Sequence, residues 1–156
     1  MMRALDLLAL LGAAPAADIT PAATCTLPRA ETEAAFRALP LLSTEDDTEA
    51  DERGTIYTFR DAMLWGAPAR RIKLSDYADS KAGTATQTYE TVAAGDYTAT
   101  RAQLLAAHGK AKCDREFEHG CDINFANEGK WQKALTIGQT GDGLIVLTCI
   151  FSIPPG

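Results

Sequence analysis

The sequence predicts a single two-layer α+β domain, in which a mainly antiparallel five-stranded sheet carries two helices on one face. Three observations lead to this fold class. Segments rich in β-branched and aromatic residues are joined by turn residues rather than by helical crossovers, two segments have helical periodicity with capping residues, and four cysteines can form two disulfides. The expected element order is α-β-β-β-α-β-β, and its hairpin connections make the sheet antiparallel.

The N-terminal residues 1–16 have the pattern of a secretory signal peptide. A basic start precedes an apolar run at 7–14, and Ala14-Pro15-Ala16 supplies small residues at −3 and −1 of a cleavage before Ala17. The run is too short to cross a bilayer, which takes about 20 apolar residues. The alternative is an amphipathic N-terminal helix of a cytosolic protein. The pattern predicts a secreted or periplasmic protein, and the lack of an Asn-x-Ser/Thr sequon favours a bacterial periplasm.

Residues 17–24 lack periodicity and are predicted to be a flexible lead-in, so that 25–156 form the single domain. The first helix is expected to begin near Thr26, a good N-cap, and to end at Pro40. The acidic run at 45–52 follows, and it is predicted to be a solvated loop because like charges resist burial. The alternative, a calcium site, would need the central glycine of an EF-hand loop, which the run lacks.

Three strands are predicted in the middle of the chain, at 55–59, 69–74 and 84–92, because these segments are rich in β-forming residues. Gly66-Ala67-Pro68 supplies the turn between the first two. Trp65 stands beside this turn. Exposed tryptophan is a favoured anchor in protein interfaces, which makes Trp65 a candidate binding residue. The alternative is a tryptophan that closes the end of the core.

The second helix is expected to begin at Asp96 or two residues later and to end at Gly109. An irregular segment, 110–130, follows it. Two further strands are predicted at 131–139 and 144–153, joined by a hairpin turn. The last strand is apolar on both faces, so it should be central in the sheet.

The four cysteines are predicted to form two disulfides. Cys113 and Cys121 flank one short loop and are the simplest pair, which leaves Cys25 to bond Cys149 and join the first helix to the last strand. Four cysteines allow three connectivities, and the sequence does not choose strictly between them. The alternative is a zinc site, because two thiols and two imidazoles form a zinc ligand set, here Cys113, Cys121, His108 and His119. An oxidising compartment favours disulfides, so no metal is predicted.

No catalytic motif is recognisable in the chain. It has no nucleophile elbow, zincin motif or P-loop, and its only histidines are His108 and His119. Glu118 adjoins His119 and could orient it for acid–base chemistry. Catalytic carboxylates are paired by the fold rather than by spacing, and candidates in that general sense are Asp76, Asp79 and Glu90. The sequence therefore favours a non-enzymatic protein and predicts no cofactor.

The acidic composition narrows the choice of partner. The net charge of −6 opposes binding to phosphate backbones and to anionic lipid, so neither nucleic acid nor a membrane is an expected partner after signal cleavage. It favours encounter with a cationic protein. The first hypothesis is a domain that binds another protein, in one version an inhibitor of a cationic target, with Trp65, Glu118 and His119 as candidate contacts. The alternatives are a small hydrolase or lyase that uses carboxylate and histidine chemistry, and a carrier of a small molecule.

Overall fold

The computed structural model describes residues 15–156, and all but the last two residues of the predicted signal peptide lie outside this range. Over these residues the fold is predominantly β: an eight-stranded antiparallel sheet is accompanied by a three-stranded sheet and by three helices. This finding corrects the predicted fold class, a five-stranded α+β sheet with two helices on one face. The edge strands β2 and β8 are exposed throughout, so no alternation of buried and exposed residues reveals them, and β9 alternates over only five residues.

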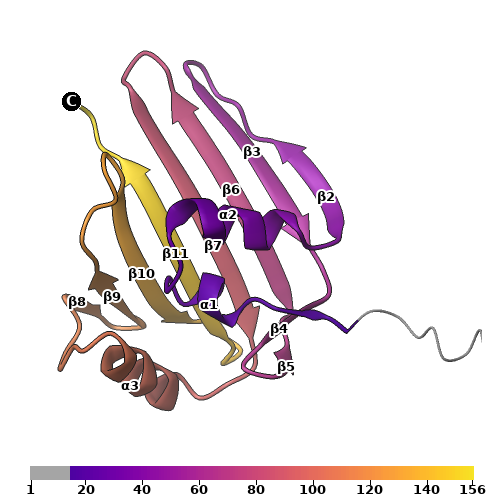
Figure 1. Ribbon diagram of the computed structural model, residues 1–156, viewed down its shortest axis with the longest axis vertical. Coiled ribbons are helices and arrows are strands. Elements are labelled where there is room, and N and C mark those ends of the chain that lie inside the picture. Colours follow the sequence, from indigo (N-terminus) through magenta and orange to yellow (C-terminus); the bar gives the residue numbers. More distant parts are fainter. Residues whose placement is uncertain (1–14) are drawn as a thin grey trace, which may run out of the picture.

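The large sheet joins its neighbouring strands by antiparallel pairing throughout. Figure 1 shows β2 and β8 at its two edges. From one edge to the other the order is β2 (Leu41–Asp46), β3 (Glu52–Phe59), β6 (Arg71–Asp79), β7 (Thr84–Ala93), β11 (Ile145–Ile153), β10 (Gln132–Gln139), β9 (Gly120–Asn124) and β8 (Arg115–Phe117). The apolar strand β11 pairs with β7 on one side and β10 on the other, so it is central, as its sequence predicts.

Two segments predicted to be irregular contribute strands to this sheet. The acidic run 45–52 begins in β2 and ends in β3, and it is a loop only between them. Every residue of β2 is exposed, so this edge strand has no buried face to mark it. The segment 110–130 contains the short hairpin β8–β9, which one of the disulfides closes.

The small sheet brings the start of the described chain against the middle of the sequence. β1 (Ala17–Asp18) runs parallel to β4 (Ala62–Leu64), and β4 pairs with β5 (Ala67–Pro68) in a hairpin. The predicted flexible lead-in, 17–24, contains β1 and α1 (Thr20–Ala23). Its apolar side chains, those of Ile19, Ala22 and Ala23, are buried in the core, which accounts for the order of this segment.

The two longer helices form where the sequence predicts helices. α2 (Arg29–Arg37) follows Pro28, and α3 (Tyr97–Ala107) begins after Asp96, whose carboxylate accepts a hydrogen bond from the Ala99 amide at 2.7 Å. Figure 1 shows α1 and α2 lying across one face of the large sheet and α3 at the end of β10. Phe36 of α2 packs its ring edge-on against Tyr89, with centroids 5.0 Å apart, so the core lies between α2 and the central strands.

The register of the strands separates the sheet into two unlike faces. One row of paired residues lies under the helices and is almost completely buried: Leu74, Tyr89, Cys149, Leu135 and Ile123. The next row points to the opposite face and is only half-buried: Lys73, Glu90, Thr148, Thr136 and Asp122. The second face is rich in threonine and serine, as expected of a sheet face in contact with water.

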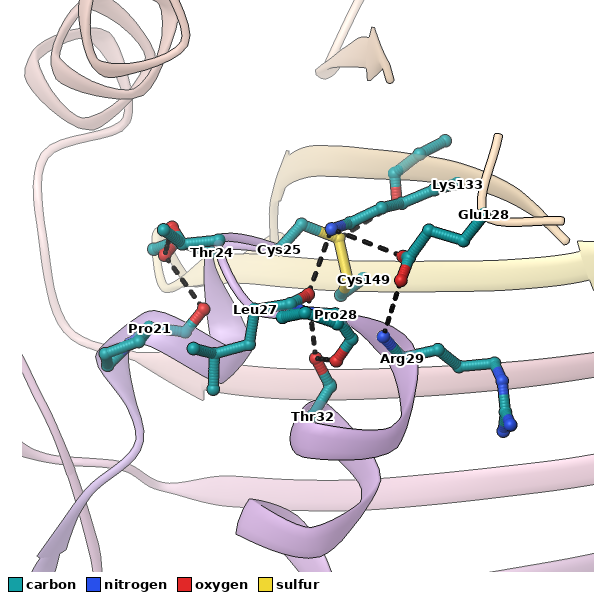
Figure 2. Close-up of a disulfide and its surroundings, with 12 residues drawn as sticks. Pro21, Thr24, Cys25, Leu27, Pro28, Arg29, Thr32, Glu128, Lys133 and Cys149 are labelled. Atoms are coloured by element: carbon teal, nitrogen blue, oxygen red, sulfur yellow. Dashed lines mark hydrogen bonds and ion pairs between the residues drawn. A yellow bond between two sulfur atoms is a disulfide. The ribbon is translucent and has the colours of Figure 1, made fainter. Parts of the chain in front are cut away.

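Both disulfides form, in the pairing that the sequence favoured. Cys25 bonds Cys149 with a Cα–Cα distance of 5.3 Å, and Cys113 bonds Cys121 at 5.6 Å. The first bond ties the segment before α2 to β11 (Figure 2). Two disulfides in a small β-rich domain are compatible with a secreted or periplasmic protein. None of the helices in residues 15–156 has the length and apolarity needed to cross a membrane.

Candidate functional site

Trp65 occupies the tip of the β4–β5 hairpin. Its φ of 50° and the φ of 76° at Gly66 are the two positive values that a type I′ turn requires. A bulky residue in this conformation costs about 1–2 kcal/mol. The Trp65 amide donates to the Thr20 hydroxyl at 2.8 Å, and the residue is 39% exposed. The hairpin therefore leaves the Trp65 side chain partly exposed at its tip, where the backbone conformation is strained. Trp65 stays a candidate contact residue.

Glu118 and His119 lie in the tight turn between β8 and β9. Their side chains are 87% and 75% exposed, and the closest carboxylate and imidazole atoms are 3.7 Å apart. Figure 1 shows this hairpin and the β4–β5 hairpin on opposite sides of the molecule. The three predicted contact residues therefore do not form one site.

The groups suggested for hydrolase chemistry are also dispersed. His108 lies at the end of α3, where its Nε2 is 3.2 Å from the Thr24 carbonyl oxygen and its ring packs against Phe125. Within residues 15–156, His119 is not among the hydrogen-bond or ring partners of His108. The cysteines of the zinc alternative are bonded to each other. Within residues 15–156, no group of three or more acidic, histidine or cysteine side chains could hold a metal ion.

The three candidate carboxylates have separate partners. Asp76 lies 3.7 Å from the Arg37 guanidinium on the helix-covered face, whereas Glu90 accepts from Arg71 at 2.8 Å on the opposite face. Asp79 accepts from backbone amides in the β6–β7 turn. Asp76 and Glu90 lie on opposite faces of the sheet and Asp79 lies in a turn, so residues 15–156 do not pair these carboxylates with one another.

Two arginines on the polar side of α2 contact side chains of the sheet and of the loop before β10. Arg29 stacks on Trp131 at 4.6 Å and donates to Gln87 at 3.0 Å, while Arg37 lies 4.7 Å from the Tyr57 ring and donates to Glu33. Each guanidinium has both an aromatic and a polar partner within the chain. These residues therefore fasten α2 to the sheet.

An exposed acidic edge is the first surface with distinctive chemistry. We define it as β2, the β2–β3 turn and the first residue of β3, which together are residues 41–52. Its side chains carry six acids: Glu45, Asp46, Asp47, Glu49, Asp51 and Glu52. At its start Leu41 and Leu42 are 54% and 63% exposed. Asp47 accepts a hydrogen bond from the Tyr77 hydroxyl at 2.6 Å, which fixes the turn on the sheet.

An amide-lined hollow is the second distinctive surface. It has a volume of about 310 Å³ and is lined by Asn124, Phe125, Asn127, Gln132, Lys133, Ala134, Ile150 and Ser152. Sequence reasoning missed both surfaces, because it treated 45–52 and 110–130 as irregular. The signal available for the hollow was a run of amide side chains, with Asn124, Asn127 and Gln132 close together in the chain. Comparison of this chain with protein-family models, curated proteins and solved structures gives no match, so these surfaces carry the functional argument.

Proposed function

We propose that this protein is an extracytoplasmic domain that binds a cationic partner protein at its acidic edge. The observation that carries the proposal is the exposure of β2 at the edge of the large sheet. This strand ends the large sheet, and all six of its residues are exposed. An edge strand presents unpaired backbone N–H and C=O groups, to which an extended segment of another protein can add as a further strand.

The side chains of the acidic edge define the chemistry of the partner. Leu41 and Leu42 offer apolar contact area next to the backbone edge. Glu45 and Asp46 lie on the strand itself, so a strand that pairs with it meets negative charge along its length. A basic segment that carries apolar residues matches both features. The net charge of −6 accelerates the encounter with such a partner and slows encounters with acidic ones.

The other edge of the sheet is less suited to strand addition. β8 has only three residues, and a disulfide joins its approach to β9. Short edge strands offer few backbone groups for pairing. β8 is therefore too short to pair well with an added strand. β2 is longer and exposed along its whole length, so it can receive one.

A matched pair of charge reversals tests the proposal. Wild type, Glu45→Lys/Asp46→Lys and a control, Glu31→Lys/Glu118→Lys, serve as baits in a periplasmic extract at low and at moderate salt. The control makes the same change in net charge at two exposed acids outside the edge. Affinity for each captured protein is then measured by calorimetry. We expect a cationic protein that binds wild type and control, with affinity reduced by about tenfold or more in the edge variant.

The salt series and the control provide the contradicting outcomes. Binding should weaken as salt increases, because part of the attraction is between exposed charges. Capture of no cationic protein at either salt would overturn the proposal. Equal binding by the edge variant would also overturn it, and loss of binding only in the control would move the site to α2 or to the β8–β9 turn.

A further inference from the structure

We propose a second binding site, for an uncharged saccharide of one or two sugar rings, in the amide-lined hollow on the face of the large sheet opposite α2. This site is independent of the acidic edge. The hollow lies over β9, β10 and β11, whereas β2 is at the other end of the strand order.

The strand register fixes the side of the sheet on which the hollow lies. Asn124 pairs with Ala134, and Ala134 pairs with Ile150, so their side chains point to one face. Gln132 and Ser152 are paired two residues further along and share that face. Cys149 and Leu135, which alternate with these residues, point to the helix-covered face. Asn127 reaches the hollow from the loop between β9 and β10.

The polar side chains of the hollow are not used to hold the fold. Asn124 uses its backbone amide to bond the Asp114 carboxylate at 2.7 Å. Within residues 15–156, however, the hydrogen bonds do not include the side-chain amides of Asn124, Asn127 and Gln132 or the hydroxyl of Ser152. Three amides and one hydroxyl therefore line one concavity without a hydrogen-bond partner in this part of the chain, and the three amide residues are exposed to solvent. Ligand pockets typically have a small number of such convergent polar groups.

The hollow is uncharged, although a lysine contributes to its wall. Lys133 directs its ammonium group away, to the helix-covered face, where Nζ donates to the Leu27 carbonyl at 2.9 Å. Figure 2 shows this ammonium group beside the Cys25–Cys149 disulfide and the Glu128 carboxylate. Lys133 is the only ionisable residue among the eight that line the hollow. An ionic ligand would find no counter-charge there.

The chemistry and size of the hollow indicate the class of ligand. Each side-chain amide has donors on its nitrogen and an acceptor oxygen, so a pair of amides can match a pair of neighbouring hydroxyl groups, which also donate and accept. Ala134 and Ile150 form an apolar floor against which the C–H face of a sugar ring can pack. The volume of 310 Å³ is at the small end of ligand pockets, which are about 300–1,000 Å³. A neutral mono- or disaccharide meets all three conditions.

Titration of the ¹⁵N-labelled protein with small saccharides tests this inference. The probes are cellobiose, maltose, N,N′-diacetylchitobiose and its cationic counterpart chitobiose, which lacks the acetyl groups. We expect a neutral disaccharide to give saturable chemical-shift changes in the side-chain NH₂ signals of Asn124, Asn127 or Gln132, with a dissociation constant in the millimolar range. Chitobiose should bind more weakly than its neutral counterpart.

Two variants locate the site. Asn127→Ala/Gln132→Ala should weaken binding by about tenfold or more. Thr58→Ala removes a polar group on the same face at β3, outside the hollow, and should leave binding unchanged. A well-dispersed spectrum shows that each variant is folded. The inference is overturned if no neutral probe gives saturable shifts, if the double variant binds as well as wild type, or if chitobiose binds more tightly than N,N′-diacetylchitobiose. Partner binding at the acidic edge should be the same in all these variants, so the two proposals fail separately.

Discussion

Tyr77 and Gly54 show how single residues attach the acidic edge to the sheet. A Cβ atom at Gly54 would collide with the ring of Tyr77 on the neighbouring strand and would lie 2.7 Å from the Asp47 carbonyl oxygen. Only glycine leaves room for the ring, which covers the backbone and brings its hydroxyl to the Asp47 carboxylate. The hydrogen bond to Asp47, with smaller contributions from desolvation and nearby acids, raises the pKa of Tyr77 to about 12.

The raised pKa of Tyr77 predicts a loss of stability at alkaline pH. The phenol is harder to ionise in the folded protein than in the unfolded chain, where its pKa is about 10. Its contribution to the free energy of unfolding is therefore complete below pH 10 and is lost as the pH rises from about 10 to about 12. We expect the difference in unfolding free energy between wild type and Tyr77→Phe to shrink over this interval. Urea unfolding at a series of pH values measures it.

Absorbance at the tyrosinate band supplies the control. The component of the titration that disappears in Tyr77→Phe belongs to Tyr77, and it should have its midpoint near pH 12. A midpoint near pH 10 would show that the hydrogen bond to Asp47 does not persist in solution.

The segment before α2 is attached to the sheet by both a covalent bond and a polar network. The Cys25–Cys149 disulfide lies next to Lys133, whose ammonium donates to the Leu27 carbonyl and is 3.6 Å from a Glu128 oxygen. The other Glu128 oxygen accepts from the backbone amide of Arg29 at 3.1 Å (Figure 2). The two disulfides therefore differ in what they connect: one joins distant parts of the chain, and the other closes a local hairpin.

Removal of the two disulfides should have unequal effects on stability. In the chain-entropy account, a bond that spans 124 residues stabilises by about 4–5 kcal/mol, and one that spans 8 residues by about 2–3 kcal/mol. We expect Cys25→Ala/Cys149→Ala to lose more unfolding free energy than Cys113→Ala/Cys121→Ala, which is its matched control. Urea unfolding at neutral pH makes the comparison. An equal or larger loss in the second variant would show that the entropy of the unfolded chain, which the long bond restricts more, does not determine the size of the effect.

The sequence predicts elements well where local signals and burial agree. α2 and α3 have helical periodicity and end signals, and β7, β10 and β11 are long segments of β-forming residues. β2 is missed because all its residues are exposed and several are acidic. The hairpin β8–β9 is missed because β8 has three exposed residues and the alternation in β9 covers only five. Edge strands are specified by pairing with a neighbour, which a local pattern does not record.

The candidate surfaces depend on the whole molecule, and this is why sequence reasoning did not find them. The amide-lined hollow brings residues 124–134 beside residues 150–152, and only the β9–β10–β11 register makes them neighbours. The acidic edge becomes a site only because β2 has a neighbour on one side and none on the other. By contrast, Trp65 and the Glu118–His119 turn were chosen for residue type, and the fold places them apart.

The free edge of β2 also determines how this molecule behaves toward its own copies. Two such edges could pair with each other through their backbones, but Glu45 and Asp46 would then bring like charges together. The acids therefore protect the edge from self-association while leaving it open to a basic strand. We predict that Glu45→Thr/Asp46→Thr, which removes the charge and introduces β-forming side chains, increases self-association. Glu31→Thr/Glu118→Thr removes the same charge at exposed positions outside the edge and should remain like wild type. Sedimentation velocity over a range of protein concentrations measures the effect, and identical profiles for the edge variant and wild type would mean that the acids are not what keeps the edge unpaired.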